Sequence, residues 1–209
     1  MSRLGQKTII QALKPYTQDY TKKYHLRELA RELEINHSSL RPYLDSLKEK
    51  GLIKEKKQGR NKVFSLNHNS DLLPYYLVQA EADRTAEFLE DNRTIRSFWK
   101  NLRDKVPYED RGDIEILALF GSFARGTEDE GSDIDLLLSA PEELTEKVTK
   151  SCKKLEAVTG RTIELEETSS LRNLLAHKGH GTFGEIINNH VLLLGIENFV
   201  QTARRFQGV

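Results

Sequence analysis

Residues 114–138 constrain the fold of this chain more than any other segment, because they contain two strand-like runs separated by a turn bounded by glycines. Residues 114–120 are an apolar run of strand length. Residues 133–138 alternate, so that Ile134, Leu136 and Leu138 would share one face of a strand. The pattern predicts a sheet that buries this apolar face.

The six residues that follow the first predicted strand have the composition of a phosphate site. Gly121 permits close approach of the main chain to a ligand, and Ser122 supplies a hydroxyl and an amide at the expected start of a short helix. A helix N-terminus favours phosphate through its free N–H groups and its dipole. Arg125 adds a fixed positive charge that could neutralise a triphosphate or stabilise the turn, and Gly126 ends the helix.

The second predicted strand begins with two carboxylates, Asp133 and Asp135. Side chains at i and i+2 of a strand share one face and lie roughly 7 Å apart. Like charges this close are costly unless a cation compensates them, and hard oxygen ligands suit Mg²⁺ or Mn²⁺. The pair predicts a metal site, although an isolated Asp-x-Asp is more often a solvated turn.

The order of these pieces is more specific than any one of them. The string Gly121-Ser122-x-x-Arg125-Gly126, six residues, then Asp133-x-Asp135, with Ser132 before the first Asp, resembles the nucleotidyltransferase superfamily of polymerase-β type. Within it, the chain is most similar to the minimal nucleotidyltransferases. The resemblance covers about 113–199, including an apolar segment at 191–195 that is similar to their terminal strand.

The resemblance implies an α+β fold with a mixed sheet and flanking helices. It implies that Asp133 and Asp135 bind Mg²⁺ or Mn²⁺ and act in catalysis, and that Gly121, Ser122, Arg125 and Ser132 contact the nucleotide. The reaction would transfer a nucleoside monophosphate, with AMP preferred, from ATP or another triphosphate to an unknown acceptor, for which a protein is one candidate.

Active relatives usually add a third carboxylate from a neighbouring strand. The candidate strand here is 162–167, in which Glu164 is flanked by apolar residues and Glu166 shares its face. Neither is Asp, which is the departure that matters. Two alternatives therefore stay open: an active enzyme with Glu164 as catalytic base, and a domain that binds nucleotide or a partner without turnover.

The first third of the chain predicts a different module. Helical spacing predicts helices at 4–13, 24–34 and about 37–50, with Asn36 as the N-cap of the third. Near-alternating runs on both sides of 58–61 then predict a β-hairpin with a basic tip. Residues 4–67 resemble a winged helix-turn-helix domain, most clearly in Leu44-x-x-Leu47-x-x-x-Gly51-Leu52-Ile53.

That resemblance implies binding of double-stranded DNA. Four residues of the third helix would face the major groove, and two on the hairpin would reach phosphates or the minor groove: Ser38, Ser39, Arg41 and Tyr43, then Arg60 and Lys62. Pro42 suggests that the helix starts a residue or two late. The alternative is that this module mediates protein contacts.

Charge also separates the two ends of the chain. Residues 1–67 hold 15 Lys and Arg against 7 Asp and Glu, whereas residues 68–209 hold 17 against 25. Basic surface attracts phosphate backbones and acidic surface repels them, so the two ends are expected to have different partners. We expect a winged helix at 1–68, a helical connector at 69–108 and a nucleotidyltransferase domain at 109–209.

The connector carries an apolar stripe formed by Ile95, Phe98, Trp99 and Leu102. Packing against the second domain and a homodimer seam both fit this stripe. Cys152 is the one cysteine, which excludes a disulfide within the chain. No apolar stretch reaches the roughly 18 residues of a membrane span, so we expect a cytoplasmic protein without a membrane partner. His177 and His180 have metal-ligand spacing, but no third ligand lies near them in the sequence.

Overall fold

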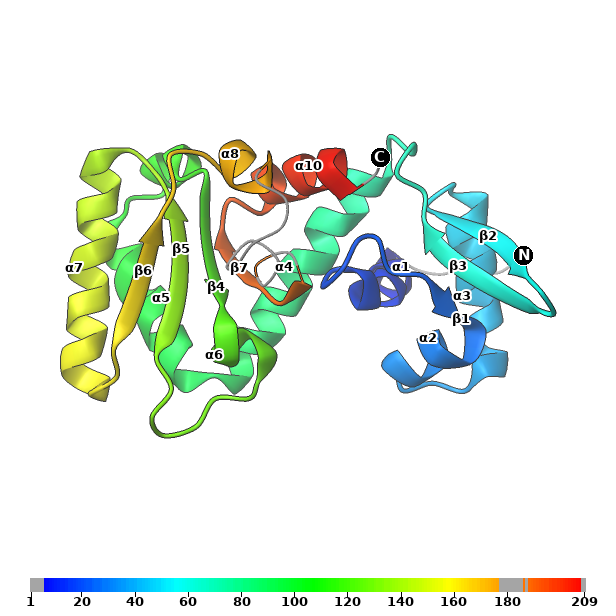
Figure 1. Ribbon diagram of the computed structural model, residues 1–209, viewed down its shortest axis with the longest axis horizontal. Helices are drawn as coiled ribbons and strands as arrows, with labels where there is room; N and C mark the ends of the chain where they lie inside the picture. The colour runs from blue at the N-terminus through cyan, green and yellow to red at the C-terminus, as the bar shows by residue number, and fades with distance from the viewer. Residues whose placement is uncertain (1–5, 177–185, 187, 208–209) are drawn as a thin grey trace. The chain divides into compact units, whose positions relative to one another are not determined.

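The computed structural model describes residues 6–176, 186 and 188–207 (Figure 1). The chain divides into two compact units, which are described separately: unit 1 comprises Met1–Glu81 and Ala203–Val209, and unit 2 comprises Ala82–Thr202. Each unit contains one sheet, so the protein has a mixed α+β architecture. Among the described residues, the helices are too short or too polar to cross a membrane.

Unit 1 contains short helices and a three-stranded antiparallel sheet of order β1-β3-β2. The elements are α1 (Gln6–Leu13), the 3₁₀ helix η1 (Lys14–Tyr16), β1 (Tyr24–His25), α2 (Leu26–Glu32), α3 (His37–Glu49), β2 (Ile53–Gln58) and β3 (Asn61–Leu66). The predicted hairpin is confirmed, with Gln58 and Asn61 paired at its tip. The last residues of α10 (Ile196–Gln207) also belong to this unit.

Two predictions of helix boundaries in unit 1 are wrong. Tyr24 and His25 do not begin the second helix but form β1, which pairs with Phe64 and Val63 of β3. Such a pairing depends on a segment about forty residues further along the chain, so local periodicity does not reveal it. The third helix does not start late, since Asn36 accepts a hydrogen bond from Ser38 N (3.0 Å) and the helix continues through Pro42.

Tyrosines tie the elements of unit 1 together. Tyr16 and Tyr24 are both buried and meet edge to face, with ring centroids 5.0 Å apart. The Tyr16 hydroxyl donates to Phe64 O (3.2 Å) and the Tyr24 hydroxyl to Pro15 O (2.7 Å). Burial raises the pKa of Tyr16 well above its usual value of 10.0. The two hydrogen bonds link the sheet to η1, and breaking the buried one at Tyr16 would leave a polar group without a partner, which is costly.

Unit 2 is built on a four-stranded mixed sheet of order β6-β5-β4-β7 (Figure 1). Neighbours β5 and β6 are parallel, whereas β4 is antiparallel to both β5 and β7. Its elements are the end of α4 (Leu73–Asp91), α5 (Arg93–Lys105), the 3₁₀ helix η2 (Glu109–Asp113), β4 (Ile116–Phe120), α6 (Gly121–Arg125), β5 (Ile134–Ser139), α7 (Glu142–Thr159), β6 (Ile163–Glu167), α8 (Leu171–Ala176), β7 (Val191–Leu194) and the start of α10.

One face of this sheet is covered by α5 and α7, and buried residues of both helices pack there against buried residues of the strands. Ile134, Leu136 and Leu138 lie in this cluster, as their alternation predicts. The stripe of α5 joins the same cluster: Ile95, Phe98 and Leu102 are at most 1% exposed, and Trp99 packs against them. Of the two alternatives for that stripe, packing within the second domain is the one the structure shows.

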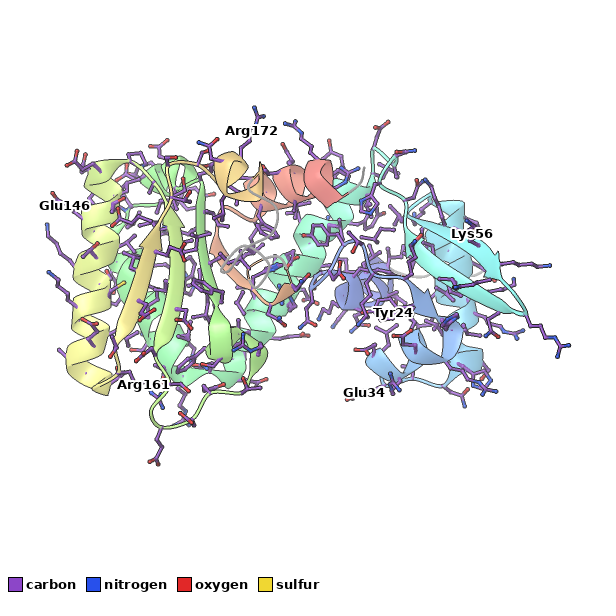
Figure 2. The ribbon with its side chains drawn as sticks, viewed as in Figure 1. Tyr24, Glu34, Lys56, Glu146, Arg161 and Arg172 are labelled. Atoms are coloured by element: carbon purple, nitrogen blue, oxygen red, sulfur yellow. The ribbon has the colours of Figure 1, made fainter. Side chains whose placement is uncertain are left out.

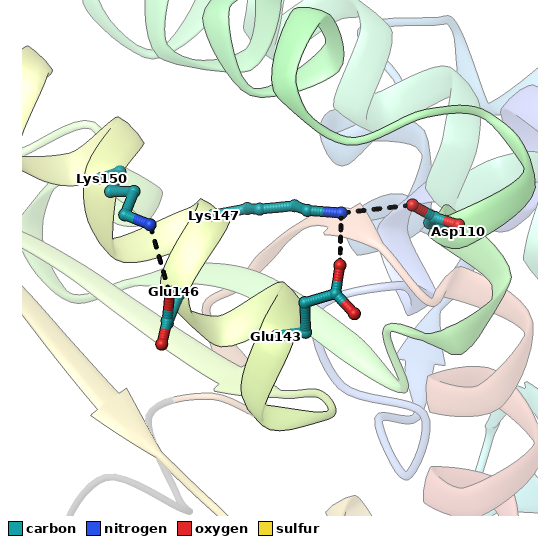
Figure 3. A network of polar contacts seen from close by, with 5 residues as sticks. All are labelled: Asp110, Glu143, Glu146, Lys147 and Lys150. Atoms are coloured by element: carbon teal, nitrogen blue, oxygen red, sulfur yellow. Dashed lines mark hydrogen bonds and ion pairs between the residues drawn. The ribbon is translucent and has the colours of Figure 1, made fainter.

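An ion-pair network links η2 to α7 (Figure 3). Lys147 lies 3.4 Å from Asp110 and 3.2 Å from Glu143, while Lys150 pairs with Glu146 at 3.2 Å. Hydrogen bonding to Glu143 raises the pKa of Lys147. Partly exposed pairs of this kind add little to stability, and of these pairs only Lys147–Asp110 joins η2 to α7.

Candidate functional site

The predicted phosphate-binding turn meets one of the predicted carboxylates, Asp135, where β4 ends and α6 begins. Phe120, the last residue of β4, pairs with Asp135 of β5. Gly121 follows in a left-handed conformation with φ +68°. A Cβ at this position would lie 1.9 Å from Asp135 Oδ2, so the carboxylate rests directly on the main chain of Gly121. Only glycine permits both the backbone conformation and this contact.

The two aspartates of the second strand differ in exposure. Asp133 precedes β5 directly and is exposed, whereas Asp135 lies within the strand and is partly buried. Ile134 N donates to Thr162 O (2.9 Å), which fixes the main chain just after Asp133. The extended chain therefore carries two carboxylates on the sheet face opposite to the core formed with α5 and α7.

Glu164 is the carboxylate that strand register brings next to Asp135. The two residues are Cα partners in the parallel pair of β5 and β6, so their side chains share one face. Glu166 pairs instead with Leu137, one step further along the strand. Both glutamates are exposed. No group of three His, Cys, Asp or Glu side chains among the described residues is arranged to hold a metal ion.

The short helix α6 presents Ser122 beside the Gly121–Asp135 contact. Its first residue, Gly121, is buried and Ser122 is half-buried. Gly126 ends the helix with φ +66°, and Thr127 N donates back to Ser122 O (3.0 Å). Arg125 is exposed in the last turn. The turn that the glycines predict is therefore present, with free space around Gly126.

Ser132 is engaged within the loop between α6 and β5. Its hydroxyl donates to Asp129 Oδ1 (2.9 Å) and accepts from Asp129 N (2.9 Å). Gly131 N donates to the same carboxylate (3.0 Å), and these hydrogen bonds, that of Ser132 first, lower the pKa of Asp129. The structure thus places Ser132 as a loop-forming residue, and its predicted contact with nucleotide stays a prediction.

Arg161 is a residue of this site that sequence reasoning missed. Its Nη1 donates to Asp129 O (2.7 Å) and Ser132 O (2.8 Å), both in the loop before Asp133 (Figure 2). Its guanidinium carbon lies 5.3 Å from the centre of the Phe123 ring in α6. A single arginine after the glycine that ends a helix is a weak sequence signal, so only the folded chain identifies it.

The donor set of this site fits a hard divalent cation. Asp133 and Asp135 offer carboxylate oxygens, the ligands that Mg²⁺ and Mn²⁺ prefer. The absence of a side chain at Gly121 leaves the Asp135 carboxylate against open main chain. The site includes an exposed carboxylate beside a half-buried one, which is compatible with a cation shared between protein and a phosphate ligand.

The predicted DNA-contacting residues of α3 lie in the first half of the helix, between Ser38 and Tyr43. Ser39 and Arg41 are exposed, and Tyr43 is half-buried. The Ser38 hydroxyl donates to the capping Asn36 Oδ1 (2.9 Å), so this serine supports the start of the helix. Arg41 also lines a groove between α3 and the hairpin.

On the hairpin, Arg60 is exposed at the tip, but Lys62 is held by Glu55. Lys62 Nζ lies 2.5 Å from Glu55 Oε1, and Lys48 of α3 lies 2.9 Å from Glu55 Oε2. Glu55 thereby ties the hairpin to α3, and these two lysines lower its pKa. Lys56 and Lys57 are exposed on β2, and Figure 2 labels Lys56 on this strand.

The histidine pair considered as a metal site, His177 and His180, lies outside the described residues. His190 is described: it is buried, and its Nδ1 is 2.7 Å from Ile186 O. This histidine is a structural residue beside β7.

Comparison with known proteins supports a nucleotidyltransferase domain in unit 2. Residues 95–188 match the family described as "Nucleotidyltransferase domain". A solved structure described as "Crystal structure of the toxin-antitoxin with AMP-PNP" is similar at a TM-score of 0.35 and 21% identity, over 56% of this chain and 86% of that chain. With so low a TM-score, this similarity adds nothing on fold or function. No curated protein was found to match the chain.

Proposed function

We propose that unit 2 is a nucleotidyltransferase that moves a nucleoside monophosphate, AMP in the first instance, from a nucleoside triphosphate to an acceptor. The observation that carries the proposal is the Asp135 carboxylate resting on the main chain of Gly121, at the start of α6. This contact puts a predicted cation ligand next to a predicted phosphate-binding turn. The match of residues 95–188 to the nucleotidyltransferase domain family supports the same general activity.

In this proposal, Gly121 and Ser122 bind the phosphates of the nucleotide through main-chain N–H groups and the serine hydroxyl. Arg125 offsets negative charge on the triphosphate. Asp133 and Asp135 would hold Mg²⁺ or Mn²⁺, which when bound supplies a Lewis acid that withdraws charge from phosphate oxygens. The half-buried position of Asp135 on a buried strand keeps this carboxylate in a defined place.

The transfer is an in-line substitution at the α-phosphorus. An acceptor oxygen forms a new bond to this phosphorus, the bond between the α-phosphorus and its bridging oxygen breaks, and pyrophosphate leaves. The acceptor loses a proton, which Glu164 accepts in this proposal. Its register next to Asp135 supports the role, because both carboxylates face the same side of the sheet.

Unit 1 is proposed to bind double-stranded DNA as a winged helix. The elements present support this: a capped helix α3, preceded by α2 across a short turn, and a hairpin with Lys56, Lys57 and Arg60 exposed. Lysine and arginine on such a hairpin contact phosphates without reading sequence. The protein would then be a regulator that combines a DNA-binding unit with a nucleotidyltransferase unit.

A second candidate function is nucleotide binding without turnover. The observation that favours it is the lack of a three-ligand cluster among the described residues, with Glu164 exposed rather than aimed into a closed site. Under this candidate, nucleotide changes DNA affinity by binding more tightly to one of two states of the protein.

The test is incubation of the purified protein with ATP labelled at the α-phosphate and Mg²⁺, alone and with cell extract. The proposal expects labelled acceptor with the wild type and none with the Asp133→Ala/Asp135→Ala variant. Nucleotide binding by the wild type with no labelled acceptor under any condition would reject the transferase and leave the second candidate.

Glu164→Gln separates the two candidates further, with Glu166→Gln as the matched control on the same face of β6. Loss of a catalytic base costs typically 10²- to 10⁴-fold, so we expect the rate of transfer to fall by about 100-fold or more in the first variant only. The measurement is the initial rate as a function of pH. Equal rates in the two variants would remove Glu164 from the mechanism.

A further inference from the structure

Arg161 connects two segments that come much earlier in the chain. It follows Gly160, which ends α7 with φ +68°, and precedes β6. Its two hydrogen bonds to the loop carbonyls of Asp129 and Ser132 span 32 and 29 residues of sequence. Its guanidinium also lies over the ring of Phe123, which is only 3% exposed in α6.

The residues on both sides of Asp133 are held by Arg161 and its neighbour Thr162. The carbonyl of the preceding residue, Ser132, accepts from Arg161 Nη1 at 2.8 Å. The amide of the following residue, Ile134, donates to Thr162 O at 2.9 Å. Consecutive residues of one connection therefore hold the peptide groups on both sides of Asp133, while the Asp133 side chain itself stays exposed. Main-chain contacts of this kind set the direction in which an otherwise mobile carboxylate projects.

We propose that Arg161 is a positioning residue for Asp133, and that it sets the affinity of the site for a divalent cation. The inference rests on the proposed function, because it takes Asp133 as a cation ligand. Arginine suits this role because one nitrogen donates to both carbonyls while the planar guanidinium lies over the Phe123 ring. The ammonium of lysine can donate to carbonyls but has no planar group to place over the ring. Mutation of a group that orients a metal ligand typically lowers metal affinity or activity by about 10- to 100-fold.

Binding of Mn²⁺ to the full-length protein tests this without relying on turnover. Free Mn²⁺ is measured by electron paramagnetic resonance for the wild type, Arg161→Ala, Arg161→Lys, Asp133→Asn and the double variant Arg161→Ala/Asp133→Asn. Arg96→Ala is the matched control, because Arg96 is an exposed arginine on α5, which packs on the opposite face of the sheet. Circular dichroism and thermal unfolding establish that each variant is folded. If Arg161→Ala does not fold, Arg161→Lys is compared with the wild type in its place.

We expect Mn²⁺ affinity to fall by about 10- to 100-fold in Arg161→Ala, to be partly restored in Arg161→Lys and to be unchanged in Arg96→Ala. The double variant should bind no more weakly than Asp133→Asn, because both changes act through one ligand. Wild-type affinity in the folded Arg161 variants, or fully additive losses in the double variant, would overturn the proposal.

The outcome is separable from that of the proposed function. A wild type that binds Mn²⁺ but labels no acceptor rejects the transferase, while the Arg161 comparison still decides the present inference. If the wild type and Arg161→Ala transfer nucleotide with the same dependence on Mg²⁺ concentration, the proposed function stands and the role of Arg161 is rejected. A wild type that binds no Mn²⁺ rejects the role of Arg161 together with the cation site.

Discussion

At the scale of single residues, Gly121 is the most constrained position of the candidate site. It combines a positive φ with the contact that brings Asp135 against the main chain. Gly126, five residues later, has nearly the same φ, +66°, but nothing lies within 4 Å of the position a Cβ would take. The two glycines therefore separate the cost of backbone strain from the cost of displacing a carboxylate.

Gly121→Ala is expected to lower nucleotidyl transfer by about 100-fold, because displacing a reacting group by 1 Å can cost this much. Gly126→Ala should carry only the backbone cost, roughly 1–2 kcal/mol of stability, and keep most of the activity. Initial rates and urea unfolding of both variants check this. Equal loss of activity in the two would mean that strain alone matters at Gly121.

At the scale of secondary-structure elements, α7 carries a thiol that reports on the integrity of unit 2. Cys152 is 5% exposed, and burial raises its pKa to about 12. At pH 8 the thiol is therefore protonated and out of reach of reagents that need a thiolate.

We expect native protein at pH 8 to react with a disulfide reagent far more slowly than protein in denaturant, because α7 must leave the sheet before the thiol is exposed. Absorbance of the released thiolate measures the reaction, and Cys152→Ser gives the blank. Rapid labelling of the native protein would show that α7 opens locally without global unfolding.

Glu55 makes the stability of unit 1 depend on pH. Its pKa is lowered from 4.5 by Lys62 and Lys48. A lowered folded-state pKa means that Glu55 stabilises the fold at pH above its unfolded value of 4.5, and that this stabilisation disappears as the pH falls through the lower folded value.

The free energy of unfolding should thus fall between pH 6 and pH 3 by a smaller amount in Glu55→Gln than in the wild type, as measured by urea unfolding of the full chain. The exposed Glu34→Gln is the control. Identical pH dependence in the wild type and Glu55→Gln would show that the two lysines do not stabilise the folded hairpin.

At the scale of the whole molecule, the separation into two units predicts separable activities. The Asp133→Ala/Asp135→Ala variant should lose transfer and keep DNA affinity. The Arg41→Ala/Arg60→Ala variant should lose DNA affinity and keep transfer. The slope of the logarithm of the DNA-binding constant against the logarithm of salt concentration should become shallower by about one for each phosphate contact that is lost. Mobility shifts on duplex DNA at two salt concentrations and the labelling assay measure the two properties. Failure of the arginine variant to weaken DNA binding would leave unit 1 as a protein-contact module.

Much of the fold is predictable from the sequence because its signals are local. An apolar stripe at helical spacing indicated α5, a continuous apolar run indicated β4, and the Asn36 cap indicated the start of α3. The strand carrying Glu164 was expected from the resemblance to the nucleotidyltransferases, and the structure shows a strand there, β6, paired with β5. A predicted boundary was wrong where the conformation depends on a strand distant in the sequence. Tyr24 and His25 pair with β3 instead of extending α2.

The sequence by itself determined the order of chemical groups: a glycine and serine at the end of an apolar strand, then two aspartates at the start of the next. Only the tertiary structure decided which other residues support them. Arg161 reaches a loop about thirty residues away, and Glu55 captures Lys62 across the hairpin. Local patterns arise from neighbouring residues, whereas these contacts depend on strand register and on how far a side chain reaches once distant segments have packed together.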